Sequence, residues 1–171
     1  NINYIKRMFK EPMALIKGVG RIQGLIVKKG NPLNIQGIDD LKNHRFVNRQ
    51  RGAGTRLLFD YKLKEMGISP EEIKGYDREA STHMAVAALV SSESADVGMG
   101  IQSAAKAMGL DFIPIGEEEY DFAIPEAYLD VPMIQSFLEV LKSKEFKERL
   151  QELGGYSLNR IGEIHLLREE G

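Results

Sequence analysis

The chain has 171 residues, of which 43% are hydrophobic and 28% charged, and its formal net charge is -2. This composition is typical of a globular protein, and the slight negative charge excludes a molecule that is basic overall and grips nucleic acid. The absence of cysteine excludes disulfides, thiolate metal sites and cysteine nucleophiles. No apolar run is long enough to cross a bilayer, and no signal peptide is recognisable. Because the sequence begins with Asn1 rather than Met, we expect it to be an excised piece of a longer chain.

The first forty residues predict one short helix and one or two strands. Apolar residues within 2–9 share one helical face, and Pro12 ends that pattern. The run 24–27 predicts a buried strand, 13–17 is a short apolar run, and the glycine-containing segment 18–21 between them is interpreted as a turn or loop.

The middle of the chain alternates short apolar strands with helices from about Leu41 to Ile115. Such alternation is typical of an α/β sheet with mostly parallel strands. We expect strands at 45–48, 96–100 and 111–115, and helices at 55–66, 82–90 and 103–108.

The C-terminal part predicts one more strand and two amphipathic helices. The run 122–125 is strand-like, and it follows three glutamates, 117–119, that we interpret as a solvated turn. Helices are expected from about Val131 and from Ser143, the second ending at Gly154. The pattern of 161–167 fits either a strand or a helix.

These elements predict two lobes. Residues 28–121 would form one complete lobe, inserted between the two parts of the other, 1–27 and 122–171. The crossings between lobes are expected near Val27 and Phe122.

One loop concentrates the features of an anion-binding site. It follows a predicted strand and opens a predicted helix, whose first N–H groups and dipole favour an anion. Two glycines allow φ > 0 and a close approach of the backbone to a ligand, and four arginines, at positions 45, 49, 51 and 56, stand in or beside it. An ordinary turn with a solvated basic rim is the alternative. The candidate ligand-binding residues are Arg49, Gly52, Ala53, Gly54, Thr55 and Arg56.

Ser81 and Thr82 precede the helix expected at 82–90. They are interpreted either as a simple helix cap or as a second set of donors for the same anion.

Other motifs give weaker signals. Gly98-Met99-Gly100 lacks the third glycine and the ribose-binding acid of a dinucleotide fingerprint, and the loop 52–54 lacks the lysine of a phosphate-binding Walker loop. The histidines at 44, 83 and 165 lack metal-ligand spacing. Without a nucleophile elbow or acid–base group near the glycines, we expect no catalytic residue, no metal and no cofactor, and we expect a binder rather than an enzyme.

The segment Arg49-Gln50-Arg51-Gly52-Ala53-Gly54-Thr55 resembles the Arg-x-x-Gly-Ser/Ala-Gly-Thr segment of type II periplasmic binding proteins for tetrahedral oxyanions. The chain is more closely similar to the binding-protein-like domain linked to molybdate, which occurs alone, behind helix-turn-helix modules and at the end of molybdopterin biosynthesis proteins. That closer resemblance is carried by 21–25, 30–32, 39–41, 95–100, 112–115 and 119–121.

The resemblance implies a type II periplasmic-binding-protein-like α/β fold with two lobes. It also implies that the first lobe is incomplete at its N-terminus, because the family's first βαβ unit has no counterpart before Asn1. Ala53 replaces the serine of the phosphate binders, so one hydroxyl donor is absent. An incomplete lobe would leave apolar surface exposed, which predicts a homodimer.

The function implied is non-catalytic binding of a small tetrahedral oxyanion, with molybdate or tungstate first. Backbone N–H groups from Gly52 to Arg56 would hold it, with a hydroxyl from Thr55 and charge from Arg49. The alternative is a ligand-sensing or accessory domain of a molybdopterin biosynthesis protein or of a transcription regulator, such as a LysR-type regulator. The expected partner is an ABC transporter or a fused DNA-binding module, without direct nucleic-acid contact by this piece. The compartment would be the cytoplasm for the fused forms and extracytoplasmic otherwise.

Overall fold

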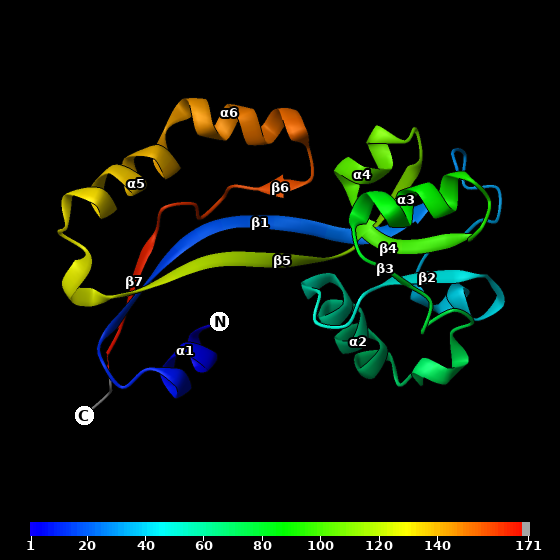
Figure 1. Ribbon diagram of the computed structural model, residues 1–171, viewed down its shortest axis with the longest axis horizontal. Coiled ribbons are helices and arrows are strands. Elements are labelled where there is room, and N and C mark those ends of the chain that lie inside the picture. The colour runs from blue at the N-terminus through cyan, green and yellow to red at the C-terminus, as the bar shows by residue number, and fades with distance from the viewer. Residues whose placement is uncertain (169–171) are drawn as a thin grey trace. The chain divides into compact units, whose positions relative to one another are not determined.

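The computed structural model describes residues 1–168, which divide into two units (Figure 1). Unit 1 comprises Asn1–Arg21 with the chain from Glu119 onward, and unit 2 is Ile22–Glu118. The chain passes between the units within strands β1 (Met13–Val27) and β5 (Asp111–Pro125). Both unit boundaries therefore fall within these strands. Unit 2 spans 22–118, whereas the sequence suggested 28–121 for the inserted lobe.

The two long strands replace segments that the sequence predicted as turns. The predicted loop 18–21 lies inside β1, and the predicted turn at 117–119 lies inside β5. In unit 1, a Cβ at Gly18 would lie 3.0 Å from the Phe122 ring and would overlap the Tyr120 carbonyl. Gly18 is therefore a site of close contact between strands rather than a turn residue.

The strands of unit 2 form a mixed sheet in the order β3-β2-β4-β1-β5. Strand β2 (Phe46–Arg49) is parallel to β3 (Glu79–Ala80) and to β4 (Val97–Ile101). Strand β4 is antiparallel to β1, with Leu25 opposite Met99. The parallel part of the sheet is therefore β3-β2-β4, at one end of this order, because the crossing strand β1 runs antiparallel to β4.

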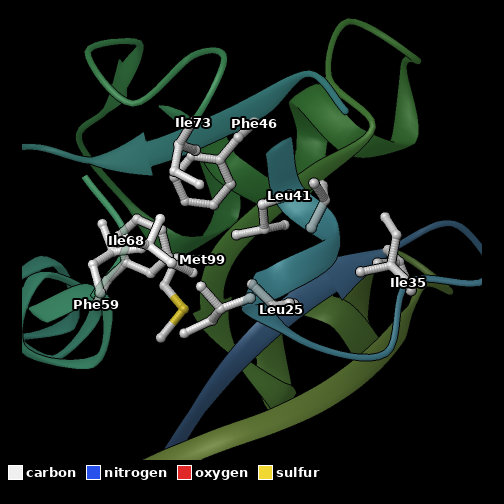
Figure 2. Close-up of a cluster of buried hydrophobic side chains, with 12 residues drawn as sticks. Leu25, Ile35, Leu41, Phe46, Phe59, Ile68, Ile73 and Met99 are labelled. Atoms are coloured by element: carbon white, nitrogen blue, oxygen red, sulfur yellow. The ribbon is translucent and has the colours of Figure 1, made fainter. Parts of the chain in front are cut away.

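One face of this sheet is covered by helix α2 (Gly54–Met66) and by the 3-10 turn η1 (Ile38–Asn43). The 3-10 turn η2 (Pro70–Glu72) has no buried residue, but Ile68 and Ile73 on either side of it belong to the same core. Phe46 stacks on Phe59 of α2 with ring centroids 4.8 Å apart. Gly67, with φ 67°, ends α2 in the left-handed conformation. Figure 2 shows the resulting cluster, which includes Leu25, Ile35, Leu41, Phe46, Phe59, Ile68, Ile73 and Met99.

The opposite face of the sheet is covered by α3 (His83–Ser91) and α4 (Gln102–Ala107) (Figure 1). A Cβ at Gly98 would lie 2.8 Å from a Val47 methyl group and would overlap one of Val86. The pair Gly98 and Gly100 thus lies within β4 and lets α3 approach the sheet.

Unit 1 is built on the first part of β1. Ile16 packs with α5 (Pro132–Lys142), whereas Leu15 packs with α1 (Ile2–Met8). Neighbouring residues of a strand point to opposite faces, so this alternation places the two helices on opposite sides of β1 (Figure 1). The remaining elements are η3 (Glu126–Tyr128), α6 (Lys144–Leu153), β6 (Tyr156–Ser157) and β7 (Ile164–Leu167).

Strand β7 pairs antiparallel with β1, so within the open segment 161–167 the residues Ile164–Leu167 form a strand. Among residues 1–168, no helix is both long and apolar enough to span a membrane.

Candidate functional site

The topology of unit 2 indicates one end of its strands as the candidate place for a ligand. The chain leaves β2 through α2 to β3 on one side, and it returns through α3 to β4 on the other side. Helices α2 and α3 consequently cover opposite faces. In α/β sheets, the crevice at the carboxyl ends of the strands, where the winding reverses, is the usual ligand site. The loop after β2 lies at that edge.

The loop itself is a tight backbone turn between Arg49 and Gly54. Gly52 takes φ 85°, which glycine adopts readily. Ala53 is the N-cap of α2, and its methyl side chain cannot accept a hydrogen bond from the first turn. A backbone bond of 3.2 Å from Gln50 N to the Ala80 carbonyl ties this loop to the loop after β3.

Thr55 uses its hydroxyl within the protein. The side chain is buried, and Oγ1 donates to Oε1 of Gln23 on β1 over 2.8 Å. With its oxygen so engaged, the Gln23 amide directs Nε2 toward Glu118 on β5, to which it donates. The hydroxyl that the sequence assigned to an anion thus orients a buried amide donor instead.

The carboxylate of Glu118 rests against Gly54, the first residue of α2. A Cβ at position 54 would lie 2.9 Å from Cδ of Glu118 and would overlap Oε1. Gly54 therefore leaves room for the carboxylate in its present position, and a larger residue there would displace the Glu118 side chain. The φ of Gly54 is not positive. A negative group in this place is stabilised by the positive end of the helix dipole.

Arg56 is a structural residue in this geometry. Its side chain is 4% exposed, pairs with Glu79 and donates to the Arg49 carbonyl over 3.2 Å. The guanidinium also lies over the Tyr76 ring, 4.7 Å from its centroid. Burial alone would lower the pKa of Arg56, but its interactions with Tyr76 and Glu79 raise that pKa overall.

Tyr76 links this arginine to α2. Its hydroxyl donates to Oδ1 of Asp60 over 2.7 Å. Burial, together with this hydrogen bond, raises the pKa of Tyr76 despite the opposing charge of Arg56.

Arg49 joins the two candidate segments. Its Nη2 donates to the Ser81 carbonyl over 3.2 Å, and its Nε donates to Oε1 of Gln50 over 3.3 Å. Ser81 is exposed beside it, whereas the hydroxyl of Thr82 caps α3 by accepting from Ala85 N over 3.0 Å. The structure therefore brings Ser81 to the glycine loop and gives Thr82 a capping role.

The expected concentration of positive charge is smaller than the sequence suggests. Arg45 directly precedes β2, at the end of the strand away from the loop, and it pairs with Asp96 over 2.8 Å. Arg51 is 81% exposed and lies 3.8 Å from Glu79, the partner of Arg56. Both acids come from distant parts of the chain, so the sequence around the loop gave no sign of them.

Gln23 and Glu118 were not identified from the sequence. Gln23 lies directly before the apolar run 24–27, and Glu118 is the middle residue of three glutamates. In the structure Glu118 is half-buried and its two neighbours are exposed, as expected for alternating residues of a strand. The sequence carried no such signal, because these glutamates were interpreted as a turn. The pairing of Gln23 with Glu118 depends on β1 and β5 being neighbours, which the local pattern does not reveal.

A cavity of about 250 Å³ lies at the other edge of the same sheet, where β2 and β4 begin. Its lining includes Val27, Leu33, Arg45 and Asp96. We do not place the ligand there, because the glycine loop and the starts of α2 and α3 lie at the carboxyl ends.

The family model of the PBP superfamily domain matches residues 1–142. The Bacillus subtilis (strain 168) protein named "Uncharacterized protein YvgK" is 40% identical over 169 residues, which cover 97% of this chain. The chain spans about half of that relative, 54% of its length. A Clostridium pasteurianum protein named "Uncharacterized protein in ferredoxin 2Fe-2S gene 5'region" is 34% identical over 109 residues, covering 63% of this chain and 96% of its own.

Three solved structures illustrate the fold. The substrate-binding domain of a putative molybdenum ABC transporter from Clostridium difficile gives a TM-score of 0.58 at 18% identity, over 84% of this chain and 66% of its own. PEB3 bound to L-phospholactate gives a TM-score of 0.56 at 20% identity, over 83% of this chain and 67% of its own. The GluR0 ligand-binding core with L-glutamate gives a TM-score of 0.58 at 17% identity, over 87% of this chain and 67% of its own. At these identities the likeness shows the fold alone.

Proposed function

Because the chain belongs to the PBP superfamily domain family, we propose that it binds, without catalysis, a small ligand whose oxyanion group docks at the glycine loop after β2. Molybdate and tungstate are the first candidates. The observation that carries this proposal is the position of the Glu118 carboxylate, which lies against Gly54 at the start of α2. An oxyanion group of the chain itself thus already lies where we propose that the ligand binds.

The chemistry of the loop suits an unprotonated oxyanion. Backbone N–H groups and the Nε2 donors of Gln23 only donate hydrogen bonds, so they stabilise oxygen atoms that carry no proton. Arg49 adds charge between the loop and Ser81. Gly52, Ala53 and Gly54 supply the backbone, whereas we assign Thr55 and Arg56 to holding its shape.

The ligands of the similar structures support the same chemical class. Those structures are a molybdenum transporter domain, a complex with L-phospholactate and a complex with L-glutamate, and the two organic ligands carry a phosphate or carboxylate groups. We therefore propose an ABC transporter as partner. A sensing or accessory domain of a molybdopterin biosynthesis protein or regulator is the alternative. The full-length gene separates the two, because a leader peptide points to transport and an N-terminal helix-turn-helix module points to regulation.

Isothermal titration with molybdate, tungstate, sulfate, phosphate and L-glutamate tests this function. We expect saturable binding of one anion per chain, with molybdate or tungstate tightest. If only L-glutamate binds, the oxyanion group is a carboxylate and the inorganic assignment is wrong. If none of the five binds at millimolar concentration, the proposed function fails.

A further inference from the structure

Glu118 occupies the same place that the proposed function assigns to a ligand oxygen. Its carboxylate lies against Gly54 at the first turn of α2, and it accepts a hydrogen bond from Nε2 of Gln23. The Gln23 side chain is 0% exposed, and the hydroxyl of Thr55 fixes its amide orientation. A buried side-chain donor and a helix start therefore converge on one point, and the group found there is a carboxylate of the same chain.

Two negative groups cannot share this point. Like charges in contact repel much more strongly near a protein surface than in bulk water, because the effective dielectric constant is lower there. An arriving anion also needs the donors that Glu118 already uses. Glu118 is half-buried on β5, so rotation of its side chain toward solvent vacates the place without moving the strand.

We propose that Glu118 is an internal competitor for the oxyanion subsite formed by Gln23 and the start of α2, and that it sets the affinity for ligand. This inference rests on the proposed function. In the ligand-free protein the carboxylate holds the subsite, and the ligand binds by displacing it. Any anion that binds there competes with the Glu118 carboxylate, which is always present. Only an anion that interacts with these donors more strongly than the carboxylate does can displace it, so anions that interact more weakly do not bind.

The first test replaces the carboxylate and supplies it again from solution. Glu118→Ala leaves the subsite open, so acetate should raise its melting temperature by about 2 °C or more between 0 and about 100 mM, measured against sodium chloride at equal ionic strength. The parent chain and Glu117→Ala, a neighbour on the same strand, should not respond. If acetate affects all three proteins equally, the subsite does not exist.

The second test measures competition. Glu118→Gln retains the size of the side chain and removes its charge, so it should bind molybdate at least about tenfold more tightly than the parent. Glu117→Gln makes the same change in net charge and should bind like the parent. Equal or weaker binding by Glu118→Gln would overturn the proposal, because a carboxylate with a purely structural role does not compete.

The two tests separate this inference from the proposed function. If no inorganic anion binds any variant but acetate raises the melting temperature of Glu118→Ala, the subsite is supported and the assignment of an inorganic ligand is wrong. If molybdate binds the parent but acetate does not change the melting temperature of Glu118→Ala, the proposed function is supported and the internal competitor is refuted.

Discussion

At the scale of single residues, Arg49 is the side chain that we expect to contribute most to binding. Arg49→Ala should weaken oxyanion binding by about 1.5–3 kcal/mol, the range for a hydrogen bond to a charged group. Titration calorimetry with molybdate measures the change. Arg51→Ala is the matched control, because this arginine is 81% exposed and its replacement removes the same charge. Equal affinities of the two variants would show that Arg49 acts only as a surface charge.

Arg56 should contribute to folding instead. Arg56→Ala removes a buried guanidinium that pairs with Glu79 and lies over Tyr76. We expect a loss of about 2–3 kcal/mol in the free energy of unfolding, less than for a fully buried pair because Glu79 is partly exposed. Urea denaturation gives the value, and Arg51→Ala should change it by less than about 0.5 kcal/mol. A fully stable Arg56→Ala variant with impaired binding would reverse this assignment.

The residues of the loop could be predicted from the sequence, but their partners could not. The glycines, Arg49 and Ser81 come together at one edge of the sheet, as their positions after strands indicated. The roles of Thr55 and Arg56 depended on Gln23 and Glu79, which lie far away in the chain. Local spacing carries no information on which distant acid or amide a side chain will meet.

At the scale of elements, the start of α2 requires space for a negative group. Gly54→Val introduces a Cβ where Oε1 of Glu118 now lies, so it should displace the carboxylate and also keep an anion away from the backbone. We expect a larger loss of molybdate affinity than in Arg49→Ala, measured by titration calorimetry. Gly37→Val is the control, since Gly37 is extended and a Cβ added there would meet nothing within 4 Å. Normal affinity of Gly54→Val would show that no ligand approaches this glycine.

The helices were predicted well and the long strands were not. Helix α2 ends at the glycine that the sequence indicated, and α3 begins after its threonine cap. Strand β5 was predicted as two pieces, and only 24–27 of β1 was predicted as a strand, because glycines and glutamates normally interrupt strands. Here Gly18 admits the neighbouring strand, and Glu118 turns its side chain toward the glycine loop. Both exceptions depend on tertiary contacts.

At the scale of the whole molecule, unit 1 carries apolar side chains that predict self-association. Met133 and Val140 lie two turns apart on one face of α5 and are 74% and 55% exposed. We expect a homodimer in sedimentation equilibrium at low micromolar concentration, and a monomer for Met133→Glu combined with Val140→Glu. Leu57→Glu, on α2 of unit 2, should leave the dimer intact. A parent chain that sediments as a monomer would contradict this prediction.

The central claim is that the loop after β2 is the ligand site. Amide ¹H–¹⁵N spectra recorded during titration with molybdate test it most directly, because each backbone N–H reports separately. If the ligand binds at this loop, the largest shifts should occur at Gly52, Ala53, Gly54 and Thr55, together with the side-chain amide of Gln23. Saturable shifts confined to another part of the chain, with these signals unchanged, would contradict it.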